Sequence, residues 1–179
     1  MRSPPTPSRP PPRAPAAAAA APAQAAQVSD SGNIDSNADS LPTALATSAG
    51  PLVRSGEFDE RRVTLNGKAL FDGNDAPWQF PVRSFTLSQG REAILMASSG
   101  GRGNSCETLF FFLLIDGSDV KTTPEFGTCA PQGRYTQRGD RIALELPKMG
   151  GMSTAELKDG DVFEDGKLLA LDASNDPSQ

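Results

Sequence analysis

Two cysteines, Cys106 and Cys129, flank the segment that most constrains the fold of this chain. Between them, Asp116-Gly117-Ser118-Asp119 is typical of a two-residue hairpin loop of type II′. Residues equally distant from such a loop pair across the hairpin, and the two cysteines are equally distant from it. A hydrogen-bonded antiparallel pair places its Cα atoms roughly 5.5 Å apart, within disulfide range. The sequence therefore predicts a hairpin closed by a Cys106–Cys129 disulfide.

The same register gives the two strands of the hairpin different places in a sheet. Leu109 to Ile115 is apolar on both faces, which predicts a central strand. Val120 to Phe126 has one polar face and is expected at an edge, where the missing N–H of Pro124 is tolerated. A bulge near Pro124 or Gly127 would shift the pairing of Cys129 by one residue.

A disulfide would also indicate the cellular compartment of the protein. Closing a loop of this length stabilises a domain by roughly 3 kcal/mol, and such bonds persist in oxidising compartments. The alternative is a pair of buried free thiols in a cytosolic protein. We therefore expect a periplasmic or secreted protein.

The rest of the chain shows further turn signals between short alternating segments. These turns are Asn66-Gly67, Gln89-Gly90, Gly139-Asp140 and Asp165-Gly166. Only 152–159 resembles a helical turn. The spacing predicts an all-β fold, a small antiparallel β-sandwich or barrel-like meander of about eight or nine strands with one disulfide-clipped hairpin.

Composition divides the chain into a fold and its flanks. Residues 1–27 are rich in Ala and Pro and contain no Val, Ile, Leu or aromatic residue, so they cannot bury enough apolar surface to fold. We expect 28–51 to be a disordered linker, 52–172 a β-rich globular domain, and 173–179 a disordered tail.

The first segment has the outline of a secretory signal. Arginines precede a run of alanines, and small-residue triplets suited to cleavage lie at 21–23 and 23–25. Its middle is only weakly apolar, which leaves two alternatives, an Ala/Pro-rich spacer or a start codon assigned at the wrong place. Together with the expected disulfide, the segment favours export.

Charge and residue types exclude several classes of function. The chain carries a net charge of −5 and no basic stripe, which argues against nucleic-acid and anionic-membrane partners. It has no histidine, which removes Ser-His and Cys-His nucleophile systems and His-containing zinc sites. The longest apolar run, Leu109 to Ile115, is far shorter than the roughly twenty residues of a spanning helix. We expect no cofactor, no metal and no membrane span.

A glycine-rich segment, 98–105, is the first choice for a contact surface, because binding residues concentrate on loops held by a rigid scaffold. Its backbone amides could cradle an anion, but it lacks the phosphate-loop pattern. The alternative is a plain connection between neighbouring strands. The candidate binding residues are Ser99, Gly100, Gly101, Arg102 and Asn104.

Other motifs have ordinary structural explanations. Ser118 and Lys121 match an S-x-x-K spacing, but its usual partner motifs are missing and Ser118 is needed in the turn. Asp72 to Asp75 and Asp159 to Asp165 are acidic clusters that fit tight turns better than a calcium loop. Trp78 is expected in the core. We assign no catalytic residue.

Three motifs within 83–146 carry a resemblance to a group of proteins. They are Ser99-Gly100-Gly101 with Asn104-Ser105-Cys106, then Phe110-Phe111-Phe112, and finally Pro124 to Cys129, which ends in the letters FGTC. This pattern resembles small exported proteins of proteobacteria whose activities are uncharacterised. The resemblance implies a periplasmic or secreted location and supplies no activity or site residues.

These observations favour a non-enzymatic binding module of the bacterial envelope, with a protein, peptide or glycan as ligand, inhibitor and immunity types included. One alternative is a structural envelope component. The other is a histidine-free hydrolase that uses paired carboxylates.

The intact mass of the protein, recovered from its native cells without reductant, tests export and the disulfide together. We expect an envelope species that is cut near Ala23 to Ala26 and is about 2 Da lighter than its dithiol form. A full-length cytosolic species with two free thiols would contradict both expectations.

Overall fold

The computed structural model describes residues 29–37, 41–73, 76–99 and 106–170. Within these ranges the chain forms fifteen β-strands and three short 3-10 helices. All of the strand pairs are antiparallel, which confirms the predicted all-β class. The strands outnumber the predicted eight or nine because several are only two to four residues long.

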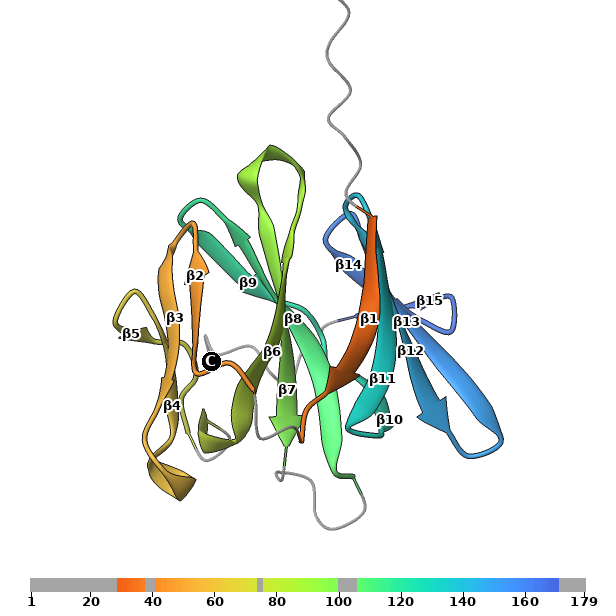
Figure 1. The fold of residues 1–179 in the computed structure, drawn as a ribbon, viewed down its shortest axis with the longest axis horizontal. Helices are drawn as coiled ribbons and strands as arrows, with labels where there is room; N and C mark the ends of the chain where they lie inside the picture. Colours follow the sequence, from red (N-terminus) through yellow and green to blue (C-terminus); the bar gives the residue numbers. More distant parts are fainter. Residues whose placement is uncertain (1–28, 38–40, 74–75, 100–105, 171–179) are drawn as a thin grey trace, which may run out of the picture.

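The strands form three sheets, which lie side by side in Figure 1. In spatial order, the six-stranded sheet contains β1 (Ser29–Asp35), β11 (Gln132–Arg138), β12 (Arg141–Lys148), β13 (Gly151–Lys158), β14 (Asp161–Glu164) and β15 (Lys167–Leu168). The central sheet contains β10 (Phe126–Cys129), β8 (Thr108–Asp116), β7 (Glu92–Ser99) and β6 (Gln79–Thr86), and β9 (Asp119–Thr122) also pairs with β8. The four-stranded sheet contains β2 (Ala44–Thr47), β3 (Gly50–Ser55), β4 (Arg62–Leu65) and β5 (Lys68–Ala69). The helices are η1 (Phe58–Glu60), η2 (Ala76–Trp78) and η3 (Ser88–Gly90).

The central sheet is buried on both of its faces. In β8, Phe110 and Phe112 belong to the core shared with the six-stranded sheet, whereas Phe111 belongs to the core shared with the four-stranded sheet. In β7, Leu95 and Met96 divide between the two cores in the same way. Successive side chains of a strand point to opposite faces, so only an uninterrupted apolar run can serve both cores. The predicted central position of the β8 segment is confirmed.

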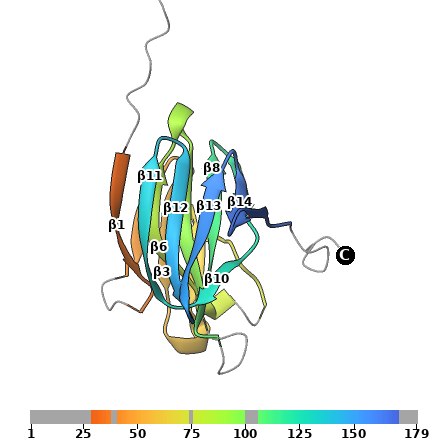
Figure 2. The same cartoon turned by 90° about the vertical axis from the view of Figure 1, so that its right-hand side faces the viewer.

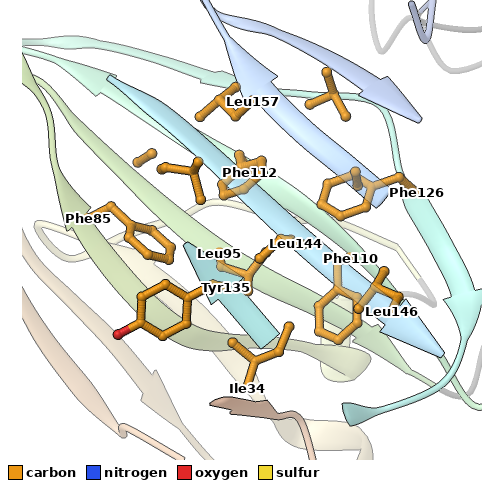
Figure 3. Close-up of a cluster of buried hydrophobic side chains, with 14 of the residues drawn as sticks. Ile34, Phe85, Leu95, Phe110, Phe112, Phe126, Tyr135, Leu144, Leu146 and Leu157 are labelled. Atoms are coloured by element: carbon orange, nitrogen blue, oxygen red, sulfur yellow. The ribbon is translucent and has the colours of Figure 1, made fainter. Parts of the chain in front are cut away.

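The larger core lies between the central and the six-stranded sheet. Figure 3 shows Phe85, Leu95, Phe110, Phe112 and Phe126 of the central sheet facing Ile34, Tyr135, Leu144, Leu146 and Leu157 of the six-stranded sheet. Phe85 makes edge-on ring contacts with both Phe112 and Tyr135, which joins the two sheets through aromatic packing.

The hairpin between the cysteines keeps the predicted register near its loop and loses it farther away. β9 pairs with β8 as predicted, but Cys129 pairs with Thr108 and not with Cys106. The shift is therefore two residues, one more than the sequence analysis allowed for. The predicted disulfide is nevertheless confirmed, with the Cα atoms of Cys106 and Cys129 4.7 Å apart.

The shift begins where β9 ends, at Thr123 and Pro124. The Thr123 amide donates to the Phe112 carbonyl over 2.9 Å, but the Phe112 amide donates to Thr123 Oγ1 and not to a backbone carbonyl. Pro124 has no N–H with which to continue the ladder, and β10 resumes at Phe126. A bulge follows, with Gly127 at a φ of +124°. Among the described strands β9 and β10 pair with β8 alone, so the predicted edge position is confirmed.

Residues 28–51 are not the disordered linker that their composition predicted. β1 and β2 lie within this range and β3 begins in it, so that prediction is wrong and the described fold begins at Ser29. β1 buries Ile34 and otherwise leaves its side chains partly or fully exposed. Its pairing with β11 rests on backbone hydrogen bonds, which a polar sequence makes as well as an apolar one. The predictions for 1–27 and 173–179 lie outside the described residues.

The predicted helical turn at 152–159 is also wrong, because these residues belong to β13 and the turn that follows it. Ser153, Ala155 and Leu157 are buried and Thr154 is exposed, which is the alternation of a strand. Small side chains at two of the buried positions concealed that alternation. The predicted turns at Gln89-Gly90, Asn66-Gly67, Gly139-Asp140 and Asp165-Gly166 each connect two paired strands, as expected.

Two adjacent residues of β7 test the two-sided burial of the central sheet. We expect Leu95→Ala and Met96→Ala each to lower the free energy of unfolding by about 2–5 kcal/mol, because each opens a cavity in a different core. Urea unfolding measures both, with Met152→Ala on the exposed face of β13 as the control. A small effect of either core substitution would contradict the three-layer arrangement.

The disulfide closes a loop with a sequence separation of 23 residues. We expect the double variant Cys106→Ser with Cys129→Ser to lose roughly 3 kcal/mol of unfolding free energy, because its unfolded chain is no longer constrained. Urea unfolding without reductant measures the loss. An unchanged midpoint would contradict the expected contribution of the cross-link.

Candidate functional site

The predicted binding segment falls largely outside the described residues. Ser99 is the last residue of β7 and is half-buried, whereas Gly100, Gly101, Arg102 and Asn104 are not among the described residues. The site that can be built from described side chains is therefore the end of the fold at which β7 stops.

Five elements converge at that end of the molecule. β4 and β6 begin there and β7 ends there, at the lower end of the view in Figure 1. η1 contacts η2, and η2 contacts β4 and β7. We call this region, made of η1, η2, the first residues of β6 and the last residues of β7, the η1 end. The four-stranded sheet brings η1 to it by packing against the central sheet.

A buried amide lies beside the point where the predicted loop leaves the sheet. Gln79, the first residue of β6, pairs with Ser98 of β7 and donates from Nε2 to Ser98 Oγ over 3.3 Å. The Gln79 side chain is only 8% exposed, and its Oε1 atom has no hydrogen-bond partner. A buried carbonyl oxygen without a donor costs free energy, so a donor that reached Gln79 Oε1 would stabilise the η1 end.

Two arginines pack against one phenylalanine at the η1 end. The guanidinium carbon of Arg54, near the end of β3, lies 5.0 Å from the ring centroid of Phe80. The guanidinium carbon of Arg61, just before β4, lies 5.7 Å from the same centroid. Both distances are those of cation–π contacts. Both side chains reach the Phe80 ring because β3 and β4 are neighbouring strands joined by one turn.

That turn holds an exposed aromatic side chain in a strained backbone conformation. Phe58 has a φ of +49°, in the left-handed region that bulky residues rarely adopt, and its side chain is 71% exposed. Gly56 makes the turn possible, since a Cβ atom there would lie 2.5 Å from the Glu60 carbonyl oxygen. The Phe58 ring lies 5.8 Å from the guanidinium carbon of Arg61. Strain of this kind concentrates at functional positions.

The charges of the two arginines are not balanced by carboxylates. Among the described side chains, neither Arg54 nor Arg61 forms an ion pair, although both are half-buried. Burial lowers the pKa of the Arg54 guanidinium, and the neighbouring charge of Arg61 lowers it further. The Arg54 guanidinium stays charged at neutral pH, because an arginine pKa starts far above it. The neighbouring Arg62 is exposed and donates to the backbone oxygens of Asp59 and Arg61.

A second arginine cluster shows an arginine whose charge is paired within this fold. Arg83 contacts Asp30 with a nitrogen–oxygen distance of 3.0 Å, and its guanidinium carbon lies 4.3 Å from the ring centroid of Tyr135. The Tyr135 hydroxyl donates to Asp30 over 2.9 Å and is the main cause that lowers the pKa of Asp30. Burial and the bond to Asp30 raise the pKa of Tyr135. This cluster joins β1 to the sheet and pairs the charge of Arg83, although the buried Arg83 Nε atom has no hydrogen-bond partner among the described residues.

The acidic cluster at 159–165 forms turns, whereas the one at 72–75 lies partly outside the described residues. Asp159 and Gly160 both have positive φ between β13 and β14. They border a hollow of about 320 Å³ with an apolar floor that includes Leu114 and Leu157. Within the described ranges, no group of three or more His, Cys, Asp or Glu side chains is placed to hold a metal ion.

Two further sequence predictions concern single side chains. Lys121 of the S-x-x-K spacing forms an exposed ion pair with Asp119, at 3.0 Å, and Ser118 occupies the turn that the hairpin required. Trp78 lies in η2 and is half-buried, less deeply placed than the core position expected for it.

Comparison with family models, with curated proteins and with solved structures finds no match for this chain. In the described part of the chain, no helix combines the length and the apolar character needed to cross a membrane.

The sequence analysis missed the arginine pair, Arg54 and Arg61, and the exposed Phe58. One signal was available, a single aromatic residue inside the charged run from Glu57 to Arg62. An aromatic side chain in such a run has no apolar neighbours to pack with locally, which indicates exposure. The partnership with Phe80 could not be read from the sequence, because it depends on how two sheets stack.

The Tyr135 hydroxyl gives a testable pH dependence. We expect Tyr135→Phe to raise the pKa of Asp30 toward its ordinary value. In the wild-type protein the lowered pKa of Asp30 contributes stability above the pKa that Asp30 has in the unfolded chain. That contribution disappears as the pH falls through the native pKa, so the stability of the variant should depend less on pH in this range. Carboxyl-carbon NMR titration measures the pKa of Asp30, and urea unfolding at several pH values measures the pH dependence of stability. Asp165, whose pKa is lowered to about 2 chiefly by Lys148, is the internal control and should not move.

Proposed function

We propose that this domain is a non-enzymatic binding module of the bacterial envelope that holds a protein, peptide or glycan through the η1 end. The exposed Phe58 carries the proposal. Its ring is mostly in water, its backbone is strained, and its flanking arginine stacks against it. Maintaining such a residue is costly to folding and is understandable where an aromatic side chain anchors a partner. Ser98 and Ser99, the described residues of the predicted binding segment, lie at this end.

The proposed location is the periplasm or the exterior of the cell. The Cys106–Cys129 disulfide supports it, because structural disulfides persist in oxidising compartments and are rare in the cytosol. The chain has no histidine and therefore cannot build a Ser-His or Cys-His nucleophile system.

A capture experiment with matched surface variants tests the binding surface. Immobilised wild-type protein, Phe58→Ser and Leu168→Ser are exposed to the same envelope extract, and retained components are compared quantitatively. Leu168 is a suitable control because it is also exposed, at 57%, and lies on β15 of the six-stranded sheet. We expect Phe58→Ser to retain a specific component roughly tenfold less well, as an anchor residue would, and Leu168→Ser to retain it unchanged. Equal retention by all three proteins would contradict the proposed surface.

A further inference from the structure

We infer that Arg54 and Arg61 form a binding site for a single carboxylate group of an acidic peptide. The inference rests on the proposed function and specifies the chemistry of the partner. Both guanidinium groups are half-buried, and no described carboxylate pairs with either of them. A charge that is partly removed from water without a partner is costly, and the like charge of Arg61 acts on Arg54 and adds repulsion. A bound carboxylate removes both costs.

The fold holds the arginine pair ready for such a group. Phe80 is buried, and its ring contacts both guanidinium groups at 5.0 and 5.7 Å. Stacking on an aromatic ring restricts a long side chain, so less conformational entropy remains to be lost on binding. A guanidinium group donates in a planar fork that matches the two oxygens of a carboxylate.

The charges around the pair favour a singly charged group over a polyanion. Glu57, Asp59 and Glu60 occupy the same turn and are exposed, and the whole chain carries a net charge of −5. Nucleic acid, a phosphate-rich lipid headgroup or an anionic membrane would bring many negative charges against these carboxylates. One carboxylate between Arg54 and Arg61 avoids that repulsion.

The exposed ring beside the pair favours a peptide as the source of the carboxylate. Phe58 lies 5.8 Å from the Arg61 guanidinium carbon and offers an apolar surface immediately next to the cations. A peptide can place an acidic side chain on the arginines and a neighbouring apolar side chain on the ring. A sugar acid would present hydroxyl groups to that ring.

Arginine side-chain NMR tests the carboxylate site directly on the full chain. The Nε–H signals of the wild-type protein are followed during titration with sodium acetate, against sodium chloride at equal ionic strength. We expect saturable shifts of the Arg54 and Arg61 signals and none of Arg62, whose guanidinium group contacts backbone oxygens. Equal shifts of all three arginines, or stronger shifts with phosphate than with acetate, would overturn the single-carboxylate site.

Three probes distinguish the source of the carboxylate. Acetyl-Leu-Glu-amide should saturate the shifts at roughly tenfold lower concentration than acetate, because its leucine adds contact with Phe58. The matched acetyl-Leu-Gln-amide should leave the arginine signals unshifted. If galacturonate saturates the site at a lower concentration than the acidic peptide does, the ligand is a sugar acid and the peptide assignment is wrong.

Variants separate this inference from the proposed function. We expect Arg54→Gln and Arg61→Gln each to abolish saturation by the acidic peptide and to weaken capture of the envelope component, with Arg62→Gln as the neutral control. If Phe58→Ser weakens capture but neither arginine variant does, the binding surface stands and the carboxylate site fails. If the arginine pair binds acetyl-Leu-Glu-amide but capture never depends on Phe58, the carboxylate site stands and the proposed function fails.

Discussion

The burial of the central sheet on both faces is the interaction on which the rest of the structure depends. β7 and β8 supply alternate side chains to two separate cores. Adjacent residues of one strand therefore stabilise different outer sheets. Burying one large apolar side chain contributes roughly 1.5–3 kcal/mol, and both strands contribute several. The three layers therefore form one cooperative unit. The placement of η1 beside the first residues of β6 is a consequence of that stacking.

Much of the fold could be predicted from short-range patterns in the sequence. The turn dipeptides, the apolar run of β8 and the two cysteines each act through neighbours in the chain, and these predictions held. The failures share one cause. β1 and β13 owe their strand structure to partners distant in sequence, and their small or polar side chains show little of the alternation that marks a strand. The two-residue shift at Cys129 likewise depends on a hydrogen bond that the Phe112 amide donates to the Thr123 side chain.

The candidate site was harder to predict than the fold. Arg54, Arg61 and Phe80 come from two different sheets, and no spacing in the sequence relates them. What a sequence can indicate is an anomaly, such as one aromatic residue in a charged run. That the anomaly matters is learned only from the structure, where the turn strains the Phe58 backbone and neither cation pairs with a carboxylate of the described residues. Arg83 differs from Arg54 and Arg61, because its charge is paired with that of Asp30.

The pairing of β1 with β11 also covers the backbone of β11 at the edge of the six-stranded sheet. β1 forms one edge of the six-stranded sheet, as Figure 2 shows, and it carries polar side chains that discourage a further strand from joining. A fragment that began at residue 52, where composition alone placed the domain boundary, would lack β1. It would expose the backbone donors and acceptors of β11 along a regular strand whose inner face is lined by Tyr135 and Gln137. Such an edge is a template for intermolecular pairing, so the polar amino-terminal strand protects the fold from aggregation.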